Sequence, residues 1–210
     1  MRNLTREDLI HLLDKKIFHQ ISEVADEQGV ECYVVGGYVR DLFLERPSQD
    51  IDIVTVGSGI ALAKALAGRL GRGAHLSVFS NFGTAQVKFK GMEVEFVGAR
   101  KESYSHDSRK PVVEDGTLED DQNRRDFTIN AMAMDCRGIL ADPFGGREDL
   151  KNGVIRAVGD PAERFDEDPL RILRALRFAS VLGFAVEEGT AKALHAQRQL
   201  LKCISAERIY

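Results

Sequence analysis

The alternation of apolar and polar residues along the chain predicts an α/β domain followed by helices. Apolar residues at helical spacing predict two amphipathic helices, one ending before Gly29 and one ending at Gly71, and the first should cover a sheet. Their apolar stripes are Leu9, Leu12, Leu13, Ile17, Ile21 and Val24, then Ala61, Leu62, Ala65, Leu66 and Leu70. Apolar, β-branched runs predict strands. These strands are Cys32–Val35, Ile51–Val56, His75–Phe79, Ala85–Phe89 and Val94–Val97.

The last three of these runs are separated by short turns, which predicts an antiparallel meander. Charged and turn-forming residues dominate positions 100–115, which predicts a mobile loop. The run Phe127–Met132 predicts a buried helix, and Glu119, Asp120 and Asp121 predict the solvated start of a helix. The fold class is therefore α/β (α+β), with a small mixed or antiparallel sheet flanked by helices.

The segment Val34–Asp41 combines a strand, a glycine turn and a helix. Gly36 and Gly37 follow the strand, and helical spacing begins directly after them. Glycines let a phosphate approach the backbone closely, and the free N–H groups of a new helix attract an anion. The guanidinium of Arg40 is suited to clamp that anion. Gly36, Gly37 and Arg40 therefore predict a triphosphate-binding turn.

Two aspartates stand at the start of the next predicted strand. Asp50 and Asp52 are two residues apart, and side chains at i and i+2 leave a strand on the same face. Adjacent carboxylates repel each other unless a hard cation such as Mg²⁺ neutralises them. A two-metal magnesium site would activate an attacking hydroxyl and hold the leaving oxygen. The alternative is that Asp50 caps a turn and Asp52 is solvated on an edge strand.

These motifs resemble the signature of the class II tRNA nucleotidyltransferase and bacterial poly(A) polymerase family. Three further blocks follow in the family's order, namely Arg124–Ala131, Asp142–Gly146 and Glu167–Phe178. The resemblance implies a nucleotidyltransferase head over residues 1–150 and the start of a helical neck over 151–210. It also implies a C-terminal body or tail that this chain does not include. Asp142, in a turn, is more suited to an architectural role than to catalysis.

The predicted strand around Val94 places Glu93 and Glu95 on one face. Glu95 resembles the family's third catalytic acid because it lies five residues before Arg100. The residues alone also allow both glutamates to lie on a solvated sheet face. Gly98-Ala99 stands where the family usually has Thr-Phe.

In the second block, the resemblance implies that Arg125 contacts nucleotide phosphates and Asp126 the ribose hydroxyls. A carboxylate can accept both hydroxyl hydrogen bonds. Asp126 could equally cap the helix predicted after it, since an acidic side chain suits a helix start. Asn130 is a further candidate, which could instead satisfy backbone groups around this turn.

The fourth block places Asp168, Arg171, Arg174 and Arg177 at every third position, with Leu170, Leu173, Leu176 and Phe178 predicted on the opposite side of a helix. Asp168 would accept from the exocyclic amine of cytosine or adenine, and Arg171 would donate to the neighbouring ring acceptor. This pair would select CTP and ATP over UTP and GTP. The resemblance implies that the pair is the family's protein template, and that the later arginines bind phosphates or orient the pair. The alternative is an N-cap before Pro169 and a solvated arginine stripe.

Net charge, apolar runs and cysteine content add three points to this prediction. The net charge of −4 is unusual for a protein that grips RNA along its length, so the main RNA-binding surface is expected elsewhere. The absence of a long apolar run and of an apolar leader predicts a cytoplasmic protein without a membrane span. Three distant cysteines favour neither a disulfide framework nor a zinc site.

The sequence therefore predicts a magnesium-dependent transferase that adds nucleotides to an RNA 3′ end and releases pyrophosphate. The resemblance implies that it adds CCA, from CTP and ATP, to tRNA 3′ ends. A poly(A) polymerase, a CC-adding enzyme and an A-adding enzyme share these motifs, although the acidic balance argues mildly against the first. From a different class, a nucleotide-binding module without catalysis also remains open.

Overall fold

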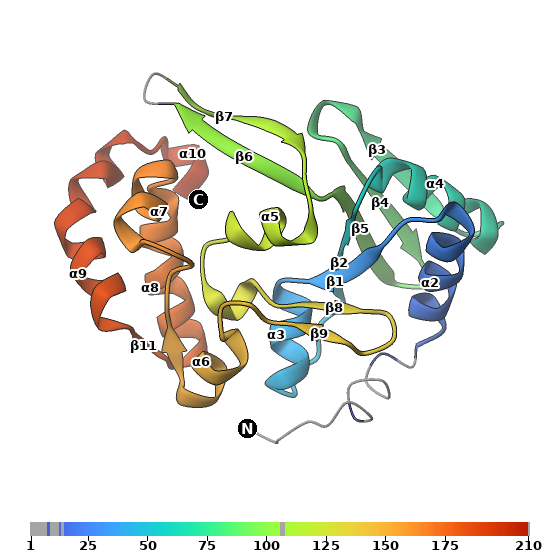
Figure 1. Cartoon of the computed structure of the whole chain (residues 1–210). Coiled ribbons are helices and arrows are strands. Elements are labelled where there is room, and N and C mark those ends of the chain that lie inside the picture. Colours follow the sequence, from blue (N-terminus) through green and yellow to red (C-terminus); the bar gives the residue numbers. More distant parts are fainter. Residues whose placement is uncertain (1–7, 9–12, 14, 106–107, 210) are drawn as a thin grey trace.

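The computed structural model describes residues 8, 13, 15–105 and 108–209. At its centre is a seven-stranded sheet in the order β3-β4-β5-β2-β1-β8-β9 (Figure 1). Its strands are β1 (Cys32–Val35), β2 (Asp50–Thr55), β3 (His75–Phe79), β4 (Thr84–Phe89), β5 (Met92–Gly98), β8 (Ala133–Asp135) and β9 (Leu140–Ala141). β2 and β5 run parallel and all other neighbours antiparallel, so the predicted mixed sheet and the β3–β5 meander are confirmed.

The helices of the described residues lie mainly at the two ends of the molecule. Figure 1 shows α7 to α10 on one side and α2 and α4 beside the sheet on the other. The helices are α2 (Lys16–Gln28), α3 (Gly37–Phe43), α4 (Gly59–Leu70), α5 (Leu118–Asn123), α6 (Gly146–Asn152), α7 (Pro161–Glu167), α8 (Leu170–Leu182), α9 (Glu188–Gln197) and α10 (Ala206–Ile209). Short 3₁₀ segments are η1 (Ser80–Phe82), η2 (Thr128–Asn130) and η3 (Arg198–Cys203).

The main core lies between one face of the sheet and helices α2 and α4. Ile17, Ile21 and Val24 of α2 are buried as their spacing predicts, and α2 ends at Gly29 in the left-handed conformation. The predicted residues Leu9 and Leu12 lie outside the described residues. The core side chains of the strands include Val34, Ile51, Ile53, Val94 and Phe96. Burial of these alternate positions turns the intervening residues of β2 and β5 to the opposite face.

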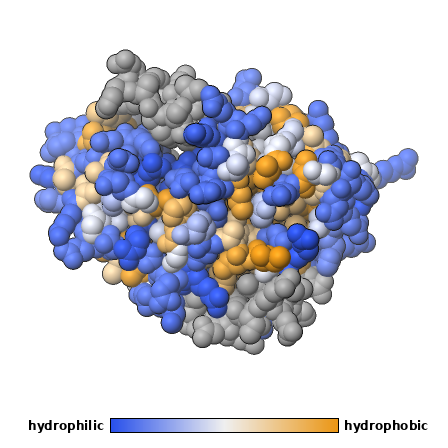
Figure 2. Space-filling view, in the orientation of Figure 1, coloured by the Kyte–Doolittle hydropathy of each residue, from blue (hydrophilic) through white to orange (hydrophobic). Residues whose placement is uncertain are grey.

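The opposite face carries a smaller apolar cluster. Val35, Val54, Ala99 and Ala133 are buried there, and Leu118 of α5 packs against them. Figure 2 shows hydrophilic side chains over most of the region of α7 to α10, and apolar side chains gathered nearer the sheet. Because this cluster occupies only part of the face, the acidic side chains of β2 and β5 can remain accessible beside it.

The prediction of a mobile loop at positions 100–115 is wrong. The segment forms an antiparallel pair of strands, β6 (Arg100–Ser105) and β7 (Ser108–Asp115), with an irregularity in its register near Ser103. The ladder of a two-stranded pair is made by backbone N–H and C=O groups, which every residue except proline offers in full, so a charged sequence can adopt it without an alternating apolar pattern.

The predicted buried helix at 127–132 is buried but is not an α-helix. Thr128–Asn130 form the 3₁₀ turn η2, and the chain then enters β8. Phe127 forms a bridge with Ala157, and β8 pairs with β1. These pairings lie far apart in sequence, so tertiary contacts override the local helical pattern.

The last part of the chain is helical except for a short parallel pair, β10 (Val154–Ile155) and β11 (Ala185–Val186). A domain boundary near residue 150 remains a prediction. In the described part of the chain, no helix is both long enough and apolar enough to span a bilayer.

Candidate active site

Carboxylates from two neighbouring strands meet on the open face of the sheet. Asp50 pairs in register with Glu93, and Asp52 pairs with Glu95. β2 lies between β5 and β1, so the alternative of Asp52 on an edge strand is wrong. Of the two glutamates, Glu93 accepts hydrogen bonds from Lys88 Nζ (2.6 Å) and Gln86 Nε2 (3.1 Å). Glu95 is instead close enough to Asp52 for the two charges to interact.

The electrostatics of this face show acids held close together. Burial raises the pKa of Asp52, the guanidinium of Arg125 opposes that rise, and the charge of Asp50 adds to it. Burial and the charge of Asp52 likewise raise the pKa of Glu95. A raised pKa means that the ionised form is disfavoured, here first by burial and then by the charge of the neighbouring carboxylate. A bound cation would remove this repulsion.

The donor set fits magnesium better than a metal held by protein alone. Among the described residues, no group of three or more His, Cys, Asp or Glu side chains is arranged to hold a metal ion. Mg²⁺ is usually bound by one or two carboxylates together with substrate phosphates and water. Asp50 and Asp52 supply such a pair of hard oxygen ligands.

The glycine turn lies directly beside these carboxylates. Gly36 has φ 68°, and a Cβ atom there would lie 3.1 Å from Arg125 Nη1 and 3.6 Å from Asp52 Oδ2. A side chain would therefore be strained and would fill the space between the two charged groups. α3 begins at Gly37, one residue before the predicted start, and a Cβ atom at Gly37 would lie 3.5 Å from Arg40 Nη2.

Arg125 is held in place by an aspartate that the sequence analysis had interpreted as solvated. Asp121 is fully buried, and its Oδ2 accepts from Arg125 Nε (3.0 Å) and Nη2 (2.8 Å). Its Oδ1 accepts from Arg124 Nε at 2.9 Å. The solvated interpretation of Asp121 is therefore wrong. Its spacing of three and four residues from the two arginines was the available signal, because side chains so spaced face each other on a helix.

Arg40 is anchored within the protein. Its Nε and Nη2 donate to the carboxylate of Asp41 at 2.9 and 3.0 Å, and its Nη1 donates to Asn130 Oδ1 at 2.9 Å. Its guanidinium carbon lies 5.2 Å from the centroid of the Phe178 ring, a cation–π contact. Arg40 thus connects the start of α3 with α8.

Asp126 is also connected to α8. It is only 9% exposed, and its Oδ2 accepts from Arg174 Nε (2.7 Å) and Nη2 (2.6 Å). Its Oδ1 accepts from the backbone N–H of Phe127 at 2.8 Å. Phe127, rather than Asp126, is the N-cap residue of η2.

The four charged positions of the fourth block occupy different environments. Asp168 accepts from the Leu170 N–H (3.1 Å) and from Arg208 Nη2 (3.2 Å). The capping alternative is wrong in its register, because the N-cap residue of α8 is Pro169 and Asp168 is the C-cap residue of α7. Arg171 is buried and donates to Glu167 (2.7 Å) and to the carbonyl oxygens of Arg164 (3.1 Å) and Arg124 (2.8 Å). Arg177 is exposed.

The predicted apolar side of this helix is also partly wrong. Ile172 and Ala175 are the buried apolar residues of α8, whereas Leu176 is 49% exposed. Asp142 matches its architectural interpretation, because its carboxylate accepts from the N–H groups of Gly146 and Arg147 at the start of α6.

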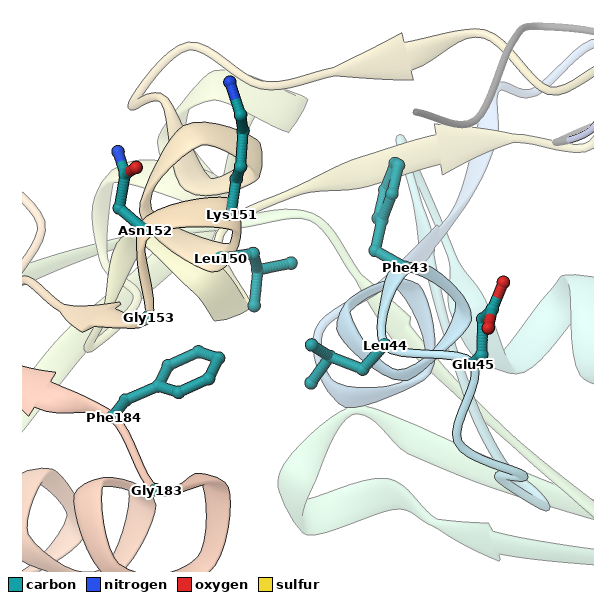
Figure 3. A pocket seen from close by; sticks show the side chains of 9 residues that line it. All are labelled: Phe43, Leu44, Glu45, Leu150, Lys151, Asn152, Gly153, Gly183 and Phe184. Carbon is teal, nitrogen blue, oxygen red and sulfur yellow. The ribbon is translucent and has the colours of Figure 1, made fainter. Parts of the chain in front are cut away.

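One cavity of the described structure lies away from these residues. It measures about 500 Å³ and lies at the C-terminal end of α3, opposite the glycine turn. Figure 3 shows Leu44, Leu150 and Phe184 pointing into it, while Lys151 and Asn152 point away. A second cavity of about 330 Å³ between α5 and α7 is lined by Arg124, Arg164 and Glu167, among others. Neither cavity is lined by a predicted site residue.

The structure thus brings together Gly36, Asp52, Arg125 and Glu95 on the sheet, and ties Arg40 and Asp126 to α8. Residues 32–156, more than half of the chain, match the family described as "Poly A polymerase head domain". The chain belongs to this head-domain family. The match begins at β1 and ends after β10, so it contains the glycine turn, all three carboxylates and the Arg125–Asp126 pair.

Relatives of this head-domain chain include enzymes of tRNA metabolism. It is 44% identical over 191 residues to a CCA-adding enzyme of Lactobacillus helveticus, covering 90% of this chain and 46% of the relative. It is 46% identical over 169 residues to an A-adding tRNA nucleotidyltransferase of Aquifex aeolicus, covering 79% of this chain and 20% of the relative. The chain thus spans half or less of the length of these curated relatives.

Solved structures of related enzymes are also similar to this chain. A tRNA nucleotidyltransferase complexed with a primer tRNA and an incoming ATP analog is 42% identical, with a TM-score of 0.78, and the match covers 90% of this chain and 53% of that one. The Bacillus stearothermophilus CCA-adding enzyme in complex with CTP is 38% identical, with a TM-score of 0.77, covering 92% and 47%.

Proposed function

We propose that this chain carries the catalytic head and the first neck helices of an enzyme that adds CCA, from CTP and ATP, to tRNA 3′ ends. The observation that carries the proposal is the meeting of Asp50, Asp52 and Glu95 beside Gly36 and Arg125. Similarity to CCA-adding enzymes over 90% of the chain supports it. Residues 1–150 would form the head and 151–210 the start of the neck.

In this proposal the head binds the nucleotide by its phosphates and ribose. The N–H groups at Gly36 and Gly37, with Arg40 and Arg125, would hold the triphosphate, and Asp126 would accept hydrogen bonds from the ribose hydroxyls. The 3′ hydroxyl of the RNA would attack the α-phosphate, forming a new P–O bond as the bond to pyrophosphate breaks. Positioning and charge neutralisation supply most of the catalysis in such transfers.

Asp50 and Asp52 would hold magnesium, with Glu95 beside them. Bound Mg²⁺ supplies charge neutralisation for the phosphates and lowers the pKa of the attacking hydroxyl. The raised pKa values of Asp52 and Glu95 support this assignment, because these acids are placed where a cation would stabilise their ionised forms.

The neck would choose the base. Asp168 would accept from the exocyclic amine of cytosine or adenine, and Arg171 would donate to the ring acceptor. Arg171 already donates to Glu167 and to two carbonyl oxygens, so it would read the base only with donors that these contacts leave or release. Arg174 and Arg177 would help to bind phosphates or orient the pair. Asp168→Ala should therefore admit UTP and GTP, and full rejection of both by this variant would contradict the template.

The decisive experiment extends a tRNA that lacks its 3′ CCA and reads product lengths on a sequencing gel. The enzyme is given CTP alone, ATP alone or both, each with magnesium and with EDTA. Two added residues from CTP alone, a stop at three with both, and no product in EDTA would support CCA addition.

Other results would select the alternatives. A long ladder from ATP alone would identify a poly(A) polymerase, and addition confined to C would identify a CC-adding enzyme. Addition of one A only to tRNA ending in CC would identify an A-adding enzyme, which the Aquifex aeolicus relative favours as the second candidate. No extension by any nucleotide would favour a nucleotide-binding module without catalysis.

A further inference from the structure

Asn130 contacts three of the residues that are proposed to bind the nucleotide. It is 6% exposed and lies in the turn η2. Its Oδ1 accepts from Arg40 Nη1 at 2.9 Å, and its Nδ2 donates to Asp126 Oδ1 at 3.1 Å. Its backbone carbonyl accepts from Arg125 Nη1 at 3.3 Å. Both of these side-chain hydrogen bonds go to charged side chains, and neither goes to the backbone groups of the turn.

The chemistry of these partners requires an amide at this position. A guanidinium offers only donors and a carboxylate only acceptors, so the oxygen of Asn130 must face Arg40 and its nitrogen must face Asp126. An aspartate would place a second carboxylate against Asp126, and an alanine would leave both charged groups without this bridge. Hydrogen bonds to charged groups of this kind are among the stronger ones in proteins.

The bridge by Asn130 continues into α8. Arg174 holds the other oxygen of Asp126, and its guanidinium carbon lies 5.3 Å from the centroid of the Phe178 ring. Arg40 lies over the same ring at 5.2 Å. Asn130 and Asp126 are therefore the two inner members of a chain of contacts that begins and ends on Phe178. The two outer members, Arg40 and Arg174, share one aromatic support.

We propose that Asn130 is a positioning residue that holds Arg40 and Asp126 at a fixed separation, so that the triphosphate and the ribose of one nucleotide are bound together. The inference rests on the proposed function, which assigns Arg40 to phosphate and Asp126 to ribose. Asn130 itself would touch neither the reacting atoms nor the base. Its effect would be on affinity and on the preference for ribose over deoxyribose.

The test measures equilibrium binding of CTP and 2′-deoxyCTP to the 210-residue chain by calorimetry with magnesium. Asn130→Ala should weaken CTP binding about tenfold, which is the size expected for loss of charged hydrogen bonds. It should also bring the affinities for CTP and 2′-deoxyCTP close together. Asn130→Asp keeps an acceptor for Arg40 but repels Asp126, so it should lose the ribose preference and retain more of the affinity.

Thr128→Val is the matched control. Thr128 is buried in the same turn, and its hydroxyl donates to Asp149 Oδ2 at 2.7 Å, away from Arg40 and Asp126. This variant loses a buried hydrogen bond of similar length and should keep the ribose preference of the wild type. A merely structural role for Asn130 would give both variants the same binding behaviour.

The outcomes separate the two proposals. Equal CTP affinity and equal ribose preference in Asn130→Ala and Thr128→Val would overturn the role of Asn130. Failure of the wild type to bind CTP would overturn the proposed function, and the role of Asn130 with it. If the wild type binds both nucleotides equally, the ribose role of Asp126 is wrong. In that case the positioning role of Asn130 is supported only if Asn130→Ala binds CTP about tenfold more weakly than Thr128→Val does.

Discussion

The acidic strands β2 and β5 and the basic helix α8 both carry charged residues at regular spacing, but their side chains have different surroundings. The carboxylates Asp50, Asp52 and Glu95 lie on one face of the sheet. Arg171 is buried, Arg174 is half-buried against Asp126, and Arg177 is exposed. A spacing of two matches the repeat of a strand, whereas each step of three residues turns about 60° around a helix.

This difference between the strands and the helix shows where sequence periodicity can predict that charged side chains lie together. On a strand, one buried neighbour fixes the face of every second residue. On a helix, a charged stripe at every third position passes through buried, intermediate and exposed environments. The sheet thus presents its carboxylates together, while α8 uses two of its arginines to bind Arg124 and Asp126.

The largest expected effect tests whether the carboxylates of the sheet carry the chemistry. Asp52→Asn should lower nucleotide transfer about 10³-fold or more, because the ionised ligand of the proposed magnesium is lost. The rate is measured by single-turnover extension of tRNA. Glu93→Gln is the control, since Glu93 lies on the same face but already pairs with Lys88. Retention of a tenth of wild-type activity by Asp52→Asn would contradict the metal assignment.

The second prediction concerns the aspartate that supports Arg125. Asp121→Ala should lower the free energy of unfolding by about 3–5 kcal/mol, because two partly buried guanidinium groups lose this buried carboxylate. Denaturant unfolding measures this loss. Asp120→Ala, which removes the capping-box acid one residue earlier, should cost clearly less. Equal losses of unfolding free energy in the two variants would mean that the buried ion pairs of Asp121 stabilise the protein no more than the capping box does.

The third prediction separates two arginines of α8. Arg171→Ala should lower the free energy of unfolding by about 2–3 kcal/mol, because the buried guanidinium links Glu167 with the carbonyl of Arg124. Arg177→Ala should change it by less than about 0.5 kcal/mol, since Arg177 is exposed. Similar effects of both substitutions in chemical denaturation would contradict the stabilising role of the buried Arg171 contacts.

The smallest expected effect is on the pH dependence of stability. The folded-state pKa values of Asp52 and Glu95 are raised, so the folded protein binds more protons than the unfolded chain between the ordinary and the raised values. Their contribution to stability is therefore present below the ordinary carboxyl pKa and is lost as pH rises through the folded value. The double variant Asp52→Asn, Glu95→Gln should gain stability relative to the wild type as pH rises from about 4 to 7. A difference that is independent of pH would contradict the assigned shifts.

The sequence by itself determined much of the head. The strand, glycine turn and helix around Gly36, the helices ending at Gly29 and Gly71, and the common face of Asp50 and Asp52 all follow from local periodicity. Glycine and strand patterns act over a few residues, so they can be predicted from neighbours alone. The motif order also indicated the family.

Only the tertiary structure decided the rest. It pairs residues 100–115 as two strands, makes 127–132 a bridge residue and a 3₁₀ turn instead of an α-helix, and buries Asp121 between two arginines. It also places Asn130 between Arg40 and Asp126, which are 90 and 4 residues away along the chain. Such outcomes depend on hydrogen-bond partners from distant segments, and the demand that every buried polar group find a partner is met only when the whole chain has folded.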